Sequence, residues 1–294
     1  MDVHDLAATL PSAVLMGAVE GLTEFLPVSS TGHLILLGEV IDFRGPPGKV
    51  FEISTQFGAI LAVVWLFRDV LWRIAVRGWV PGTPARRYAR NLLLAFLPAV
   101  VLGALLYGPI TELLFSPLVA AVALVLGGVV LIAVDRQLPA PVIRSVLEMR
   151  RSTAVLIGFG QVLAMVPGVS RSGATIVVAL LAGMERRAAV EFSIMLAIPT
   201  MLAAAVFSLW KGRAALDVSA LGQVAVGFAM SFVVALAAVR WLIAVFGRIG
   251  LAPFGWYRIG LGGAILTGLA IPELAQEGAR LDTLIDSMRD ALGF

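Results

Sequence analysis

The sequence predicts an all-α polytopic membrane protein, with six transmembrane helices and two re-entrant helix pairs in an inverted-topology repeat. Three observations lead to this fold class: an apolar composition, six long apolar segments, and two similar apolar regions that polar residues interrupt. Of the 294 residues, 60% are hydrophobic and 14% are charged, whereas soluble domains contain about 45–50% apolar and about 25% charged residues. The chain is therefore expected to lie in a lipid bilayer.

Six segments have the length of about 17–25 apolar residues that a spanning helix needs. They cover approximately residues 51–68, 90–109, 117–134, 190–210, 219–246 and 252–272. Two further apolar regions, 6–45 and 153–186, are interrupted midway by proline, glycine and hydroxyl residues. Each half of these regions is about 12–18 residues long, which is short for a span, so we expect two re-entrant helix–loop–helix elements.

The two interrupted regions are related in sequence. An offset of 141 positions aligns Glu20 with Gln161 and Ser29 with Ser170. Each half of the chain then comprises one re-entrant pair and three spans, and because three is an odd number, the second half is inverted. The chain is expected to divide into a first repeat, a cytoplasmic loop, a second repeat and an acidic tail, at residues 1–134, 135–152, 153–272 and 273–294.

Arginines indicate the orientation. Residues 68–90 contain six arginines against one acidic residue, and residues 135–152 contain four arginines against two acidic residues. The positive-inside rule places both loops in the cytoplasm. Residues 1–50 and the acidic tail are then expected outside.

The composition also excludes several kinds of site. The chain has no cysteine, so it has no disulfide, no thiolate metal ligand and no cysteine nucleophile. Its two histidines, His4 and His33, are too few for a multi-histidine metal centre. Residues 1–5 carry no basic segment, so we expect no removable signal peptide. There is no basic face with aromatic residues, so nucleic acid is not an expected partner.

Polar residues concentrate in two stretches, 20–33 and 161–175, that are otherwise apolar. Ionisable side chains at membrane depth are costly and mark a functional site. Glu20 and Glu24 are four residues apart and share one face of a helix. At low dielectric such carboxylates share a proton or bind a cation, and ligation by oxygen alone favours Mg²⁺ or Ca²⁺ over zinc.

The same stretches predict a site for a phosphate-like anion. The sequences Ser29–Thr31 and Ser170–Ser172 each precede a new helix, and helix N-termini offer unpaired N–H groups at the positive end of the helix dipole. Hydroxyl residues here also serve as N-caps, but capping does not explain Arg171, whose donors suit phosphate. His33 is a candidate general acid or base. Ser30 is a candidate nucleophile that His33 would activate, with a metal-bound water as the alternative.

Two motifs, Glu-Gly-x-Thr-Glu-Phe-Leu-Pro-x-Ser-Ser-Thr-Gly-His and Pro-Gly-x-Ser-Arg-Ser-Gly-x-Thr, are present. They closely resemble the signatures of the bacterial undecaprenyl-diphosphate phosphatase family, of the bacitracin-resistance protein type, and the resemblance extends over essentially the whole chain. It implies hydrolysis of undecaprenyl diphosphate to undecaprenyl phosphate and inorganic phosphate, which recycles the lipid carrier for cell-wall synthesis and confers bacitracin resistance. It also implies a divalent cation, Mg²⁺ or Ca²⁺, and a bacterial cytoplasmic (inner) membrane location with the active site open to the periplasmic face.

By motif position, the resemblance implies that Glu20 and Glu24 bind the metal or act as base, and that Ser30 and His33 form the catalytic pair beside Arg171. It also implies that Ser170, Ser172 and Thr175 hold the diphosphate together with Arg171, and Ser29, Thr31 and Gln161 are further candidate substrate-binding residues.

A transporter or flippase of a phosphorylated polyprenyl lipid is the alternative, because inverted repeats are common in transporters. Function depends on the site more than on the fold, and a transporter does not need these carboxylates, hydroxyls and imidazole beside an arginine. The expected partners are the polyprenyl diphosphate lipid and the bilayer, and the sequence leaves open whether the protein is a homodimer.

Overall fold

The structure of the protein, a computed structural model, describes residues 3–43, 45, 50–114, 116–138, 140–212 and 221–271. This part of the chain is helical, and its one pairing of extended backbone is an isolated bridge between Ile143 and Met184. In chain order the helices are α1 (Val3–Thr23), α2 (Ser30–Val40), α3 (Val50–Leu66), α4 (Arg68–Arg77), α5 (Pro84–Leu114), α6 (Pro117–Arg136), η2 (Val146–Glu148), α7 (Arg151–Val162), η3 (Leu163–Met165), α8 (Arg171–Leu181), α9 (Arg186–Gly212), α10 (Leu221–Ile249) and a helix at Ala252–Ile271. The all-α prediction is confirmed, whereas the predicted acidic tail lies outside the described residues.

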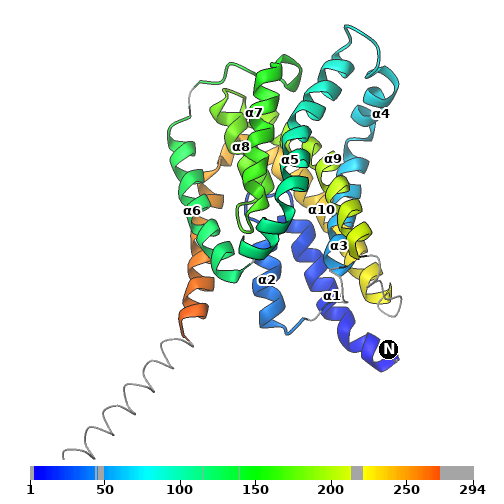
Figure 1. Cartoon of the computed structure of the whole chain (residues 1–294), viewed down its shortest axis with the longest axis vertical. Coiled ribbons are helices and arrows are strands. Elements are labelled where there is room, and N and C mark those ends of the chain that lie inside the picture. Colours follow the sequence, from blue (N-terminus) through cyan, green and yellow to red (C-terminus); the bar gives the residue numbers. More distant parts are fainter. Residues whose placement is uncertain are drawn as a thin grey trace, which may run out of the picture.

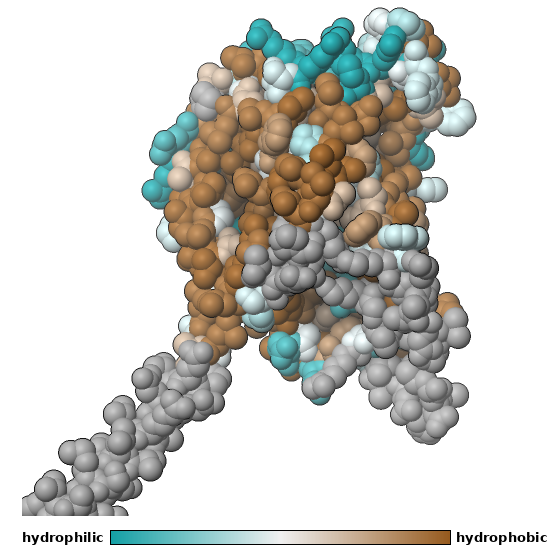
Figure 2. Space-filling model, in the orientation of Figure 1, coloured by the Kyte–Doolittle hydropathy of each residue, from teal (hydrophilic) through white to brown (hydrophobic). Residues whose placement is uncertain are grey.

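Five helices of the described chain are long and apolar enough to cross a membrane, or six if the bent pair α3–α4, which turns through 74°, forms one span. The predicted spans coincide with α3, α5, α6, α9, α10 and the helix Ala252–Ile271. The protein is therefore a multi-pass membrane protein. Figure 2 shows an apolar surface over the middle of the molecule, with hydrophilic residues gathered at the end where α4 lies.

The segment after the first span differs from the prediction. Residues 68–90 are predicted to be a loop, but Arg68–Arg77 form helix α4, in which no side chain is buried. Asp69 in the first turn and Arg77 in the last turn have the signs of charge that the helix dipole favours. The charged residues that suggest a loop in the sequence therefore stabilise a short surface helix in the structure.

The two interrupted regions form helix–break–helix pairs, as predicted. In the first pair α1 ends at Thr23 and α2 begins at Ser30, and in the second pair α7 and η3 are followed by α8 from Arg171. Figure 1 shows α1 and α2 in one half of the molecule and α7 and α8 in the other. The two breaks meet between them, where the Ser172 hydroxyl donates a hydrogen bond of 2.7 Å to the Leu26 carbonyl.

Glycine contacts bring α10 close to the helices of the first half. A Cβ atom on Gly17 of α1 would lie 2.3 Å from the Gly227 carbonyl oxygen of α10, and one on Gly58 of α3 would lie 2.5 Å from the Phe228 carbonyl oxygen. Small residues allow such close approach between helices in a bilayer, where packing replaces the hydrophobic effect as the source of stability. This packing positions α1, and with it the first polar motif.

Candidate active site

A cleft of about 210 Å³ lies where the two helix breaks meet. It is bounded by the start of α2, by α3, by the segment between α7 and α8, and by α9. It also contains Gln56 of α3, which neither motif includes. Most of the predicted site residues line this cleft, namely Glu24, Ser29, Ser30, Thr31, Gln161, Ser170 and Arg171.

Glu24 connects the two motifs across the cleft. It follows the last residue of α1, and its backbone N–H still donates to the Glu20 carbonyl at 3.0 Å. Its Oε2 accepts a hydrogen bond of 2.6 Å from the Ser30 hydroxyl, and its Oε1 pairs with Nη2 of Arg171 at 3.4 Å. A hydroxyl that donates to a carboxylate base has the arrangement of an activated nucleophile.

Arg171 is anchored on one side and retains donors on the other. Its Nη1 donates to the Ser193 carbonyl at 3.3 Å, and its guanidinium carbon lies 5.7 Å from the centre of the Phe25 ring. Its Nε atom is buried and has no hydrogen-bond partner among the described residues. A guanidinium held in this way, with its charge only partly neutralised by Glu24, suits an anion in the cleft.

Glu20 lies deeper than Glu24 and is 3% exposed. It interacts electrostatically with Glu24 and with Glu52 of α3, and its Oε2 has no hydrogen-bond partner among the described residues. A buried carboxylate oxygen without a partner is costly, so a proton or a cation is expected beside it. In the part of the chain that the structure describes, no three His, Cys, Asp or Glu residues converge on one point.

The residues that precede α2 and α8 have the same unusual backbone. Ser29 has φ 70° and ψ 95°, and Ser170 has φ 67° and ψ 114°. Positive φ at a residue other than glycine costs about 1–3 kcal/mol and is concentrated at functional sites. The Ser170 hydroxyl caps α8 by accepting from the Gly173 N–H at 3.2 Å, whereas the Ser29 side chain makes no such cap.

Two of the predicted substrate-binding residues do not reach the cleft. Ser172 and Thr175 are 1% and 0% exposed, and neither lines the cleft. The Ser172 hydroxyl donates to the Leu26 carbonyl, and the Thr175 hydroxyl lies 2.6 Å from the Ser193 hydroxyl. These hydroxyls join α8 to the first break and to α9. Gln161 does line the cleft, where its Oε1 accepts from Thr200 at 3.1 Å and its Nε2 has no partner among the described residues.

His33 contacts different groups from those expected. Its Nδ1 lies 2.8 Å from the Ser29 carbonyl oxygen and its Nε2 lies 2.7 Å from the Tyr257 hydroxyl. Because a carbonyl only accepts, Nδ1 carries the proton and Nε2 accepts from the tyrosine. The imidazole stacks on the Tyr257 ring and does not line the cleft. The hydrogen bond expected between Ser30 and His33 is therefore replaced by the one between Ser30 and Glu24.

The family model described as bacitracin resistance protein BacA matches residues 13–264, a range that includes both helix breaks and the cleft. The chain belongs to this family. It is 52% identical over 250 residues to undecaprenyl-diphosphatase 2 of Paramagnetospirillum magneticum, covering 85% of this chain and 95% of that protein. It is 48% identical over 269 residues to undecaprenyl-diphosphatase of Sphingopyxis alaskensis, covering 91% and 99%. It is 49% identical over 254 residues to undecaprenyl-diphosphatase of Pseudomonas putida, covering 86% and 92%.

One charged residue of this BacA-family chain was not selected from its sequence. Arg258 belongs to the helix Ala252–Ile271, is 1% exposed, and donates to carbonyl oxygens in both breaks, including those of Pro27 and Gly168. Its position inside a predicted span was a usable signal, because an ionisable residue within a membrane span indicates a functional site.

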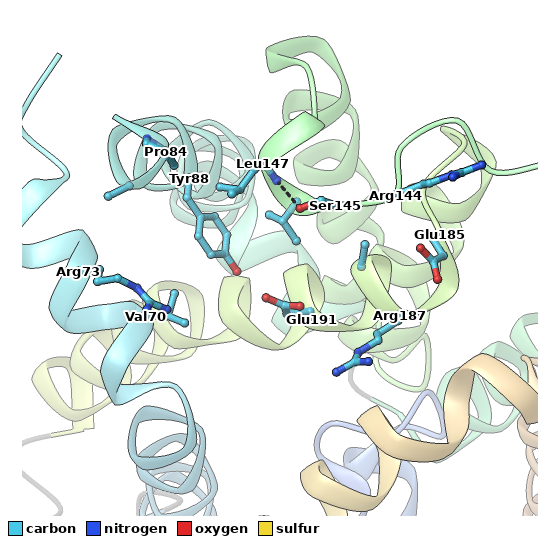
Figure 3. Close-up of a pocket in the computed structure, with 13 residues that line it drawn as sticks. Val70, Arg73, Pro84, Tyr88, Arg144, Ser145, Leu147, Glu185, Arg187 and Glu191 are labelled. Atoms are coloured by element: carbon cyan, nitrogen blue, oxygen red, sulfur yellow. Dashed lines mark hydrogen bonds between the residues drawn. The ribbon is translucent and has the colours of Figure 1, made fainter. Parts of the chain in front are cut away.

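A second cavity, of about 460 Å³, lies at the arginine-rich end of the BacA-family protein. Figure 3 shows Arg73 and Arg187 at its sides, with the Tyr88 hydroxyl directed towards Glu191. The Tyr88 hydroxyl is buried and has no hydrogen-bond partner among the described residues. No residue of the two motifs lines this cavity, so it is distinct from the candidate active site.

Proposed function

We infer that this protein is an undecaprenyl-diphosphatase, an integral membrane phosphatase that hydrolyses undecaprenyl diphosphate to undecaprenyl phosphate and inorganic phosphate. Membership of the BacA family and near-full-length relatives of that name support the activity. The observation that carries the chemistry is the contact of Glu24 with both Ser30 and Arg171 in one cleft. The product is the lipid carrier for cell-wall synthesis, and the family name associates the activity with bacitracin resistance.

In the proposed reaction, the Ser30 oxygen attacks the terminal phosphorus of the diphosphate while its proton passes to Glu24. The bond between that phosphorus and the bridging oxygen breaks, and undecaprenyl phosphate leaves. A water molecule then attacks the phosphorus of the phosphoserine. The bond between that phosphorus and the Ser30 oxygen breaks, Glu24 returns its proton to the Ser30 oxygen, and inorganic phosphate leaves with both hydrogens of the water. The 2.6 Å hydrogen bond between Ser30 and Glu24 supports this route.

Arg171 and the starts of α2 and α8 are proposed to stabilise the charge on the transferred phosphoryl group. Phosphoryl transfer depends mainly on positioning and on electrostatic stabilisation of the oxygens around phosphorus. Ser29, Thr31, Ser170 and Gln161 line the same cleft and are proposed to bind the diphosphate. Ser172 and Thr175 are instead proposed to hold α8 in place, because their hydroxyls bond within the protein.

We propose that Glu20 and Glu24 hold a divalent cation, Mg²⁺ or Ca²⁺. The unpartnered oxygen of buried Glu20 supports this, as does a donor set of oxygen atoms alone. Two carboxylates suffice for Mg²⁺, which usually binds through one or two carboxylates together with substrate phosphates and water. When bound, the cation would neutralise charge on the phosphate oxygens.

His33 is proposed to act on the position of Ser29 in place of the predicted pairing with Ser30. Its Nδ1–H donates to the Ser29 carbonyl, and Tyr257 holds the other side of the ring. Because Ser29 has a strained backbone immediately before Ser30, an imidazole bound to it would keep the nucleophile at the cleft.

The finer architecture remains our proposal: six spans and two re-entrant pairs in an inverted repeat, with the arginine-rich end in the cytoplasm of a bacterial inner membrane and the cleft open to the periplasmic face. The similar backbone angles of Ser29 and Ser170, at equivalent positions of the two motifs, support the repeat. The position of the two helix pairs in opposite halves of the molecule supports the inversion. The arginines of α4 and of the loop before α7 support the orientation.

The function is tested by measuring phosphate release from undecaprenyl diphosphate by detergent-purified protein, with and without a chelator. Metal-dependent release by the wild-type protein is the expected result. No release from folded protein in any divalent cation would contradict it. In that case, transport of a phosphorylated polyprenyl lipid by protein in liposomes becomes the function to measure.

A further inference from the structure

Arg258 is a buried cation whose partners are all neutral. It is 1% exposed, and none of its hydrogen bonds or ion pairs among the described residues involves a carboxylate. Buried charges in proteins are nearly always paired with an opposite charge. Instead, Arg258 donates to five backbone carbonyl oxygens: Nε to Leu124 at 3.4 Å, Nη1 to Pro27 at 3.3 Å and Val169 at 3.0 Å, and Nη2 to Ala123 at 3.1 Å and Gly168 at 2.8 Å.

The five contacts match the five N–H donors of a guanidinium, and they join three parts of the chain. Pro27 belongs to the first break and Gly168 and Val169 to the second, whereas Ala123 and Leu124 belong to α6. The first break and the second break are thus bound to one side chain. No other residue type could supply five donors in this planar fork.

A glycine makes room for this guanidinium. A Cβ atom on Gly127 of α6 would lie 2.1 Å from Nη2 of Arg258. Any larger residue at position 127 would therefore clash with the guanidinium and displace it. By contrast, a Cβ atom on Gly263 would meet no atom of another described segment within 4 Å. The two glycines therefore offer a test position and a control of the same residue type.

The direction of these hydrogen bonds orients the backbone of both breaks. In a trans peptide unit the C=O and the N–H point to opposite sides. The Pro27 and Val169 carbonyls point at Arg258, so the N–H groups of the next residues, Val28 and Ser170, point away from it. Neither N–H donates a hydrogen bond within the described residues. Neither Arg258 nor Val28 lines the cleft, whereas Ser170 does.

We propose that Arg258 is a positioning residue of the phosphatase reaction: it holds the two breaks so that the free N–H of Ser170 and the N-terminal ends of α2 and α8 face the diphosphate. The inference rests on the proposed function, which supplies the diphosphate. Arg258 acts through the backbone and does not touch the substrate. Its charge, which no carboxylate of the described residues neutralises, also favours an anion between the two helix starts.

Two substitutions test this role in different ways. Arg258→Lys retains the charge but has three donors in place of five. Gly127→Ala retains the arginine but displaces its guanidinium. The matched controls are Arg240→Lys, at an exposed position of α10, and Gly263→Ala. Each purified variant is assayed for KM and kcat with undecaprenyl diphosphate, for inhibition by inorganic phosphate, for direct binding of inorganic phosphate by calorimetry, and for its unfolding temperature.

We expect both test variants to bind inorganic phosphate at least about tenfold more weakly than wild type, the scale of one lost charge-assisted hydrogen bond, with KM raised in parallel and both controls unchanged. Wild-type KM and phosphate binding in a folded Arg258→Lys or Gly127→Ala protein would overturn the role. So would a variant that loses stability while its folded fraction binds phosphate normally, because the arginine would then be structural only. If Arg258→Lys does not fold, the phosphate binding and KM of Gly127→Ala decide whether Arg258 has the positioning role. Failure of both variants to fold also rejects that role.

The calorimetric measurement separates this inference from the proposed function. Suppose that wild-type protein binds inorganic phosphate, that both test variants bind it more weakly, and that no protein releases phosphate from the lipid. The phosphatase function then fails while the role of Arg258 in anion binding stands.

Discussion

Replacement of Glu24 by glutamine tests the proposed chemistry most directly. The change keeps the size of the side chain but removes the charge that faces Arg171 and the base that accepts from the Ser30 hydroxyl. A neutral amide does not take up the proton of an attacking hydroxyl. It is also a poor ligand for a hard cation beside Glu20, so we expect turnover and metal dependence to be lost together.

The expected loss of rate exceeds the expected loss of stability. A general base contributes about 10²–10⁴-fold to a rate, which is about 3–5 kcal/mol of transition-state stabilisation at 1.36 kcal/mol for each factor of ten. The pair of Glu24 with Arg171 is long, at 3.4 Å, and the arginine side chain is 12% exposed. Since the amide oxygen can still accept from Arg171, we expect the free energy of unfolding to fall by only about 1 kcal/mol.

The assay is phosphate release from undecaprenyl diphosphate in a titration with Mg²⁺, with and without chelator, alongside the unfolding temperature of each variant. Glu39→Gln is the matched control, because Glu39 is exposed on α2 and does not line the cleft. Metal-stimulated turnover by Glu24→Gln near the wild-type rate would refute the assignment of Glu24 as base and cation ligand. A comparable loss in Glu39→Gln would show that the effect is not specific to the cleft.

Three further substitutions test other parts of the site and fold. Arg171→Ala should raise KM and lower turnover, because the phosphate loses its guanidinium; full activity in steady-state assays would remove Arg171 from the site. Ser30→Ala should abolish both turnover and a phosphoserine trapped by rapid quenching, whereas a near-normal rate would favour direct attack by water with Glu24 as base. Tyr88→Phe should leave phosphate release unchanged and raise the free energy of unfolding by about 1 kcal/mol, because the buried Tyr88 hydroxyl has no hydrogen-bond partner among the described residues. A variant that is less stable in chemical denaturation would show that this hydroxyl does form a hydrogen bond.

Much of the site was predictable because it depends on short stretches of chain. The breaks at the starts of α2 and α8 follow from proline, glycine and hydroxyl residues within apolar sequence, and the structure has both. The cleft gathers most members of the two motifs, because each motif covers one break. The existence of α4 was missed, since a run of charged residues is equally compatible with a loop and with a surface helix.

The hydrogen-bond partners within the site were not predictable in the same way. Proximity in sequence suggested that His33 would pair with Ser30, yet the rotation of α2 turns the imidazole towards Tyr257, from a helix more than 200 positions away. Similarly, the hydroxyl of Thr175 is directed to Ser193 and not to the cleft. Which face of a short helix meets the cleft depends on the helices packed around it.

The sequence by itself determined that this chain lies in a membrane, where its helices break, and which residue types gather at the breaks, because these follow from hydropathy, local backbone preference and charge. Only the tertiary structure decided that Glu24 joins Ser30 to Arg171 and that Arg258 binds both breaks. These contacts link residues separated by up to most of the chain. Helix packing decides which residues meet. The partners of Arg258 are backbone carbonyls, and because every residue has one, the sequence does not show which of them the arginine binds.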